Sequence, residues 1–252
     1  QNHIRALVAL AKGQGVREVF IHVFMDGRDT PPSSGLGYVE ALETELSAIG
    51  LGRVATVTGR YYAMDRDRHF ERNEPAYLAL SCGRGQAAAS ATQAIRQAYA
   101  AGETDEFVKP RVIVDAQGAP LGRMGDGDAL FFFNFRADRA RQLCRAFFED
   151  DFKEFPRPGV PALAAFATMT RYESGFPMPA AFGPQSLDGF LGQVLSERGL
   201  RQLRIAETEK DAHGTYFLNC GVEEPLPGED RVLIPSPREV ATYDLKPQMS
   251  AR

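Results

Sequence analysis

The stretch VREVFIHVFMDGRD, residues 16–29, contains the pattern that decides the fold. Residues 16–25 are apolar almost throughout, which is typical of a strand buried on both faces. The apolar run ends at Asp26, and the polar sequence DGRD follows at once on a turn. In α/β sheets with parallel strands, ligands bind beyond the carboxyl ends of the strands. The stretch therefore predicts an α/β fold with a candidate binding site at residues 26–29.

The rest of the chain alternates between segments with strand-like and helix-like patterns. This alternation predicts a three-layer α/β/α fold with a mainly parallel sheet. Pro75 predicts a helix start or a kink, and Ser90 and Gly102 predict the cap and the stop of another helix. We expect helices at residues 3–13, 37–50, 66–83, 90–102, 136–152 and 186–199, and strands at 16–25, 53–59, 111–115, 128–134, 162–169, 200–209 and 231–237.

The composition excludes several classes of protein. A chain of 252 residues with 44% hydrophobic residues can build a large core, in one domain or two. The net charge of -4 disfavours non-specific nucleic-acid binding, and no apolar stretch approaches the about 20 residues that span a bilayer. Three cysteines without CxxC spacing (Cys82, Cys144 and Cys220) predict reduced thiols in a cytosolic protein.

Two proline-rich seams, residues 155–161 and 174–186, predict linkers or long surface crossings. The chain opens at Gln1 without methionine, directly in a helical pattern, and stops just after a turn. We therefore expect a fragment of a longer protein.

Arg28 and Asp29 form the first candidate pair. An arginine can grip an anionic group while an aspartate accepts a hydrogen bond from a hydroxyl. A surface ion pair of little energetic value explains the same two residues equally well. On this stretch alone both alternatives stay open.

Arg60 and Arg66 form the second candidate pair, after the strand at residues 53–59 and at an expected helix start. A charge-rich stretch is usually a solvated face, but Tyr61 and Tyr62 favour a stretch that folds inward.

Arg136 and Arg139 lie three residues apart and are expected in the first turn of a helix. The helix dipole disfavours cations there, and a bound anion would remove the conflict. A salt bridge to Asp138 is the alternative, and we favour the anion.

Lys210 ends the expected strand at residues 200–209 and is a candidate phosphate ligand. His213 follows it, and a lone histidine is more often a satisfied surface residue than an acid–base group. The sequence contains no GxSxG, Walker or post-strand GxGxxG motif.

Six stretches together resemble one family, the cofactor-independent (2,3-bisphosphoglycerate-independent) phosphoglycerate mutases. The resemblance covers essentially the whole chain and is carried by FMDGRDTPP, GRYYAMDRD, FFNFRADRARQL, LRIAETEK, EEPLPGEDRVLIPSP and VATYDLKPQMSA.

The resemblance implies interconversion of 3-phosphoglycerate and 2-phosphoglycerate in glycolysis through a phosphoserine, without a 2,3-bisphosphoglycerate requirement. It implies a substrate-binding phosphotransferase domain at residues 1–184 and part of an alkaline-phosphatase-like domain at 185–252. It also implies a cytoplasmic monomer. The implied substrate contacts are Arg28, Asp29, Arg60, Arg66, Arg136, Arg139 and Lys210.

The resemblance also implies what this chain lacks. The nucleophilic serine and the ligands of two manganese ions fall outside residues 1–252, so we expect the chain alone to be inactive. A non-catalytic binding module for phosphorylated three-carbon acids is the alternative. A stand-alone phosphatase is disfavoured by the missing metal ligands. Asp211 and Gly214 depart from the family pattern and predict altered local packing beside Lys210.

Overall fold

The computed structural model describes residues 2–183 and 187–250 and divides into two compact units. The first unit comprises Gln1–Leu130 and Arg139–Phe166, and the second comprises Phe131–Asp138 and Ala167–Arg252. The chain thus passes between the units three times. The domain boundary predicted at residues 184 and 185 lies outside the described residues and stays a prediction.

A four-stranded sheet forms the centre of the first unit, in the order β1-β2-β4-β3. Strands β1 (Phe20–Met25) and β2 (Arg53–Gly59) are parallel. Strands β3 (Gln86–Ala88) and β4 (Arg111–Ile113) are also parallel, whereas β2 and β4 are antiparallel. Strand β1 begins four residues later than the apolar pattern predicts, and the short β3 was not predicted.

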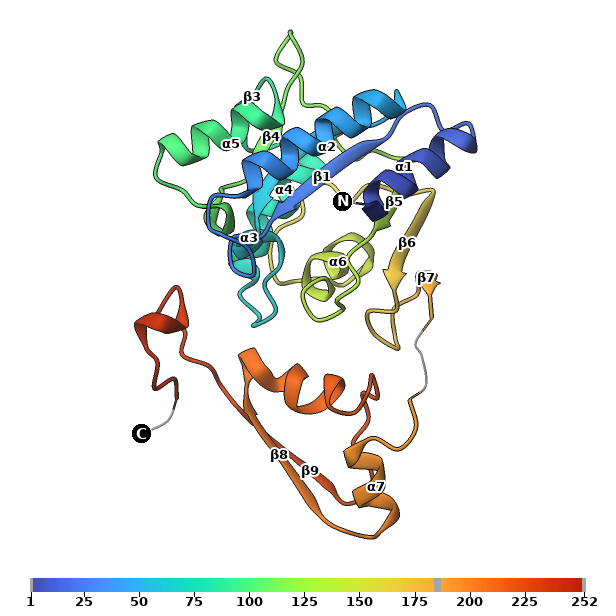
Figure 1. Ribbon diagram of the computed structural model, residues 1–252, viewed down its shortest axis with the longest axis vertical. Helices are drawn as coiled ribbons and strands as arrows, with labels where there is room; N and C mark the ends of the chain where they lie inside the picture. The colour runs from blue at the N-terminus through green and yellow to red at the C-terminus, as the bar shows by residue number, and fades with distance from the viewer. Residues whose placement is uncertain (1, 184–186, 251–252) are drawn as a thin grey trace. The chain divides into compact units, whose positions relative to one another are not determined.

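Helices α1 (Asn2–Gly13), α2 (Gly35–Ile49) and α5 (Ala91–Ala100) share one core cluster with β1, β2 and β4. Figure 1 shows α2 and α5 lying side by side across the sheet. The cluster is closed by Leu42, Val57 and Ile95, which are almost fully buried. This layer explains why β1 and β2 read as continuous apolar runs, because parallel strands covered by helices have few exposed side chains.

A second set of helices packs around α4 (Phe70–Cys82), which contacts both β2 and α6 (Arg141–Phe148). The ring of Tyr77 on α4 lies 4.9 Å from the ring of Phe147 on α6. Helix α4 runs through Pro75, so of the predicted alternatives, a helix start or a kink, the start is wrong. The predicted cap of α5 is confirmed, since the Ser90 hydroxyl accepts a hydrogen bond from the Gln93 amide.

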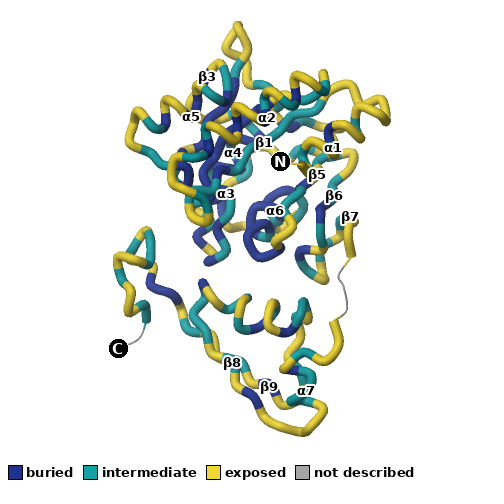
Figure 2. Tube along the Cα trace, viewed as in Figure 1, coloured by how far each residue is buried: buried dark blue, intermediate teal, exposed yellow. Residues whose placement is uncertain are grey.

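The second unit contains β7 (Ala180–Phe182) and the last residues of β5 (Ala129–Phe132) and β6 (Ala165–Thr170), which form one sheet with β6 parallel to β7. It also contains α7 (Leu191–Glu197) and the parallel pair β8 (Gln202–Glu207) and β9 (Glu229–Ile234). Along β8 and β9 exposed residues alternate with less exposed ones, whereas every residue of β2 after the first is buried (Figure 2).

The prediction of an α/β fold with mainly parallel strands is confirmed by these sheets. Within the described ranges, no helix is both long and apolar enough to cross a membrane. The three cysteines are free thiols, and burial raises the pKa of the Cys144 thiol well above its ordinary value.

Candidate functional site

The carboxyl ends of β1 and β2 lie next to each other in the first unit. Met25, the last residue of β1, is the register partner of Gly59, the last residue of β2. The polar residues that follow each strand are therefore brought to one edge of the sheet. Asp26, Arg28 and Asp29 follow β1, and Arg60 follows β2 as the first residue of α3 (Arg60–Ala63).

Arg60 joins the two strand ends. Its Nη1 donates to the carboxylate of Asp26 and to Oδ2 of Asp29, the latter at 2.9 Å. The Arg60 side chain is only 5% exposed, whereas that of Asp29 is 73% exposed. A buried guanidinium with two carboxylate partners holds an accessible carboxylate at the sheet edge. The sequence singled out Arg60 and Asp29 but assigned no role to Asp26.

Arg60 also controls the charge of Asp29. Its hydrogen bond lowers the pKa of Asp29 below the ordinary value, more than partial burial raises it, and the charges of Arg139 and Arg28 add to the lowering. Burial lowers the pKa of Arg60, but its hydrogen bonds to Asp29 and Asp26 outweigh this and raise it. At neutral pH the site therefore presents charged Asp29 beside charged Arg60.

Arg28 is paired with Glu106, which lies in the 3-10 turn η1 (Asp105–Phe107). The Arg28 Nε donates to Oε1 of Glu106 at 2.9 Å, and Nη2 donates to the same oxygen. A side chain added at Gly27 or Gly59 would clash with the Glu106 backbone, which shows how tightly η1 packs against both strand ends. Glu106 was missed because nothing in its local sequence pattern indicates a contact with residue 28.

Asp105 anchors the same turn to two other elements. Its Oδ2 accepts from the Gly35 amide at 2.8 Å, and its Oδ1 accepts from the Tyr99 hydroxyl at 2.5 Å. Burial, with the bond to Asp105, raises the pKa of Tyr99 to about 12, so the hydroxyl remains a donor. Turn η1 is thereby fixed to the first turn of α2 and to α5. We call Asp26, Arg28, Asp29, Arg60 and Glu106 the strand-end cluster.

Arg139 belongs beside the strand-end cluster. It is buried, its charge acts on Asp29, and its Nη1 donates to the carbonyl oxygen of Met64 at 2.9 Å. Met64 opens the loop between α3 and α4, and this loop also carries Arg66. The predicted helix start at Arg66 is wrong, because α4 begins at Phe70.

A buried amide–carboxylate network holds this loop in place. Gln142 Nε2 donates to Asp65 Oδ2 and to Asn73 Oδ1, both at 2.9 Å, and its Oε1 accepts from the Arg68 amide. Asp65 Oδ2 also accepts from the His69 amide. The loop that contains Arg66 is therefore bound to α4 and α6 by side chains whose polar atoms are satisfied inside the fold.

Arg136 lies in the irregular segment between β5 and α6, and the prediction that Arg136 and Arg139 open a helix is wrong. Helix α6 begins at Arg141, and Arg136 belongs to the second unit while Arg139 belongs to the first. The Arg136 Nε and Nη2 donate to the two carboxylate oxygens of Asp138 at 2.7 and 3.2 Å. The salt bridge to Asp138, which was the disfavoured alternative, is present.

Two further side chains hold Arg136 within the second unit. Its Nη2 lies 2.9 Å from Nε2 of His213, and its guanidinium lies 5.2 Å from the ring centre of Phe217. A guanidinium can only donate, so in this contact Nε2 of His213 is the acceptor. His213 thus has a structural partner, as expected for a lone histidine. We call Arg136, Asp138, His213 and Phe217 the Arg136 cluster.

Lys210 ends the 3-10 turn η2 (Thr208–Lys210), directly after β8, and is exposed. The π-helical turn His213–Phe217 follows it, which no pattern predicted. In the described part of the chain, no group of three or more His, Cys, Asp or Glu side chains could hold a metal ion. The described residues therefore do not fit a manganese site.

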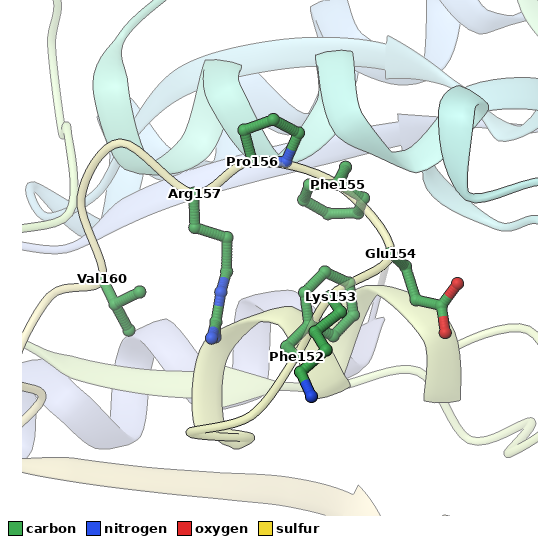
Figure 3. Close-up of a pocket in the computed structure, with 7 residues that line it drawn as sticks. All are labelled: Phe152, Lys153, Glu154, Phe155, Pro156, Arg157 and Val160. Carbon is green, nitrogen blue, oxygen red and sulfur yellow. The ribbon is translucent and has the colours of Figure 1, made fainter.

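A hollow on the surface of the first unit is lined by a different set of residues. It is formed by residues 152–157 and Val160, and the Arg157 guanidinium turns into it over the ring of Phe152, 5.0 Å from the ring centre (Figure 3). Arg157 donates to the carbonyl oxygens of Ala146 and Asp150. These contacts describe a packed proline-rich loop, and none of the predicted site residues lines the hollow.

Comparison with known proteins agrees with the geometry. Residues 1–174 match the family described as BPG-independent PGAM N-terminus (iPGM_N). The 2,3-bisphosphoglycerate-independent phosphoglycerate mutase of Nitratidesulfovibrio vulgaris is 58% identical over 249 residues, which is 99% of this chain and 48% of that protein. The enzyme of the same name from Moorella thermoacetica is 56% identical over 251 residues, 100% of this chain and 48% of that protein.

A solved structure shows the same fold. A crystal structure of Leishmania mexicana phosphoglycerate mutase at low cobalt concentration is 31% identical, with a TM-score of 0.91, over 98% of this chain and 47% of that chain. The chain thus spans about half the length of the curated relatives that it matches. Because the family model covers more than half of the chain, the chain belongs to the BPG-independent phosphoglycerate mutases.

Proposed function

We propose that this chain is the substrate-binding part of an enzyme that interconverts 3-phosphoglycerate and 2-phosphoglycerate without 2,3-bisphosphoglycerate. Membership of the family and the names of the relatives support this reaction. The observation that carries the proposal is the contact of buried Arg60 with Asp26 and Asp29 at the joined ends of two parallel strands.

The strand-end cluster offers both groups that a glycerate ligand requires. Glycerate has one carboxylate and two hydroxyls. Exposed Arg28 can donate two parallel N–H groups to a carboxylate or phosphate. Asp29 is accessible, and because its pKa is lowered it is ionised at neutral pH and can accept from a hydroxyl.

The cluster is also fixed before the ligand arrives. Arg60 is held by two carboxylates, Arg28 by Glu106, and Arg139 by the Met64 carbonyl. Groups that already point in the required direction do not need to reorganise during phosphoryl transfer. In this account the residues of the first unit bind and orient the substrate. Arg66, Arg136 and Lys210 are proposed as further contacts, on the resemblance alone.

The remaining proposals come from the family and not from the described residues. They are a phosphoserine intermediate, a nucleophilic serine and two manganese ions supplied from outside this chain, a monomeric state, a cytoplasmic location, and a boundary between phosphotransferase and phosphatase domains at residues 184 and 185.

Turnover by the full-length protein that carries this chain tests the proposal. We expect it to convert 3-phosphoglycerate to 2-phosphoglycerate in a coupled assay without added 2,3-bisphosphoglycerate. Arg60→Ala should lower kcat/KM by roughly a hundredfold, because a charged contact worth about 1.5–3 kcal/mol is lost and two acids lose their partner. Arg53→Ala is the matched control, since Arg53 starts the same strand at its other end and is exposed.

Equal activity of both variants would contradict the assignment of the site to the carboxyl ends of β1 and β2. Binding of 3-phosphoglycerate by the full-length protein without turnover would instead favour the non-catalytic binding module.

A further inference from the structure

Glu106 is a buried acid to which neither the resemblance nor the sequence pattern gives a role. It lies in turn η1, 78 residues from Arg28 in sequence, and its carboxylate contacts the Arg28 guanidinium. The Glu106 side chain is 10% exposed, while Arg28 lies at the surface. The acid is therefore the fixed partner and the arginine is the accessible one.

The side chain of Glu106 is not what holds η1 in place. The close approach of η1 to Gly27 and Gly59 is made by the Glu106 backbone. The turn is anchored by the neighbouring Asp105 through the Gly35 amide and the Tyr99 hydroxyl. The Glu106 carboxylate is therefore not needed to anchor the turn. In the strand-end cluster it accepts hydrogen bonds from the Arg28 guanidinium.

The geometry of the contact selects one edge of the guanidinium. Glu106 Oε1 accepts from both Nε and Nη2 of Arg28. A guanidinium has five N–H donors in a planar fork. With the Nε edge occupied, the edge formed by Nη1 and the second N–H of Nη2 is the one that can meet a carboxylate or phosphate in a bidentate contact.

We propose that Glu106 is a positioning residue, which holds the Nε edge of Arg28 so that the Nη1–Nη2 edge faces the anionic group of the substrate. The inference rests on the proposed function, since it assumes that Arg28 contacts phosphoglycerate. Glu106 itself acts through Arg28 and does not touch the substrate.

Glu103 provides a matched control three residues away. It is also a nearly buried acid, at 11% exposure, and its Oε2 accepts from Arg111 Nη2 at 3.1 Å. Both acids therefore sit in one segment, with similar side-chain burial and one arginine partner each, and Glu103 also accepts from the Lys109 amide at 3.1 Å. Arg111 lies on β4 and is not a candidate substrate contact.

The experiment compares Glu106→Ala, Glu106→Gln, Glu103→Ala, Arg28→Ala and the double variant Arg28→Ala/Glu106→Ala in the full-length enzyme. Glu106→Ala should raise KM for 3-phosphoglycerate roughly tenfold with a smaller change in kcat, because ligand binding loses an oriented donor. Glu106→Gln keeps the acceptor oxygen and should recover most of the loss. Glu103→Ala should lower thermal stability like Glu106→Ala but leave KM within about twofold of wild type.

The double variant separates positioning from an independent effect. If Glu106 acts through Arg28, the double variant should be no worse than Arg28→Ala, since coupled residues are not additive. Multiplicative losses in the double variant, or an equal KM rise in Glu103→Ala, would overturn the inference. If Glu106→Ala cannot be purified, Glu106→Asp must raise KM where Glu103→Asp does not.

Failure of the inference and failure of the proposed function give different results. An impaired Arg28→Ala beside a Glu106→Ala enzyme with wild-type KM overturns the role of Glu106 alone. A wild-type KM in Arg28→Ala overturns the substrate contact itself, and the role of Glu106 with it.

Discussion

Arg60 in the first unit and Arg136 in the second are both paired with acids, but by different means. Arg60 is 5% exposed and directly follows a central strand, and its partners follow the neighbouring strand. Arg136 is 45% exposed, lies in an irregular segment, and is held by the side chains of Asp138, His213 and Phe217. The pairing of β1 with β2 therefore places Arg60 beside its acids. Arg136 is instead held in place by the side chains around it.

This difference indicates which arginine contacts can be removed without loss of the fold. A buried ion pair is costly to break, because the remaining partner loses both its bond and its water. An exposed pair contributes little, because water replaces the lost partner. In the strand-end cluster Arg60 is buried and Asp29 is exposed, whereas in the Arg136 pair the arginine is 45% exposed and Asp138 is only 4% exposed. We therefore expect changes at Arg60 and at Arg136 to affect both activity and stability, with the larger loss of stability at Arg60, which has two acid partners.

The largest expected effect on stability comes from the network behind the Arg66 loop. Gln142→Leu removes the partner of Asn73 Oδ1 and of the Arg68 amide, and one donor to Asp65 Oδ2, which keeps the Asp67 and His69 amides; it should cost about 3 kcal/mol of unfolding free energy. Gln193→Leu is the control, because Gln193 makes its contacts on the exposed surface of α7 and should change stability by less than about 1 kcal/mol. Urea unfolding of the full-length protein, followed by circular dichroism, measures both, and equal losses would contradict the comparison.

The next prediction concerns the effect of Arg136 on kcat/KM. Arg136→Ala should lower kcat/KM roughly ten- to hundredfold, which corresponds to about 1.5–3 kcal/mol, and should also lower thermal stability, because the buried Asp138 carboxylate loses a bidentate partner. Arg145→Ala is its control, because Arg145 pairs with Glu149 one turn along α6 and is not a proposed contact. Steady-state kinetics with 3-phosphoglycerate decides between them. Indistinguishable kinetics for the two variants would remove Arg136 from the site.

The sequence predicted the carboxyl ends of β1 and β2 correctly, because local patterns determine them. The strands predicted at residues 16–25 and 53–59 end at Met25 and Gly59 and are parallel, and the polar residues that follow them meet at one edge. Arg28, Asp29 and Arg60 could therefore be found by pattern and by the rule that ligands bind at such edges. Whether they contact a substrate remains a proposal.

The errors lie where tertiary contacts decide the local structure. Residues 136–140 have helical spacing, yet Arg136 pairs with Asp138 and Arg139 reaches the Met64 carbonyl, so the helix begins only at Arg141. Glu106 could not be found, because its role depends on a contact with residue 28 that no local pattern encodes. The same holds for the division of the chain into interleaved units.

The smallest effect is expected from the charge of Asp29. Its pKa is lowered in the folded state, mainly by the hydrogen bond with Arg60, so its contribution is present above the ordinary pKa of 3.8. It is lost as pH falls through the folded-state pKa. Because the side chain is largely exposed, the contribution should be below about 1 kcal/mol.

Asp29→Asn should therefore be slightly less stable than wild type at neutral pH, and the difference should vanish as pH falls below 3.8 through the lowered folded-state pKa. Asp230→Asn is the control, since it removes an exposed pair with Arg201 in the second unit. Thermal unfolding across this pH range measures both variants. A difference for Asp29→Asn that grows as pH falls would contradict the sign of the shift.

The central claim is that an anionic substrate binds to the strand-end cluster at the joined ends of β1 and β2. A crystal structure of the full-length protein with 3-phosphoglycerate tests it most directly. We expect ligand oxygens at hydrogen-bond distance, about 3 Å, from the Arg28 guanidinium and the Asp29 carboxylate, with Arg28 still bound to Glu106. A fully occupied ligand that contacts neither Arg28 nor Asp29 would contradict it.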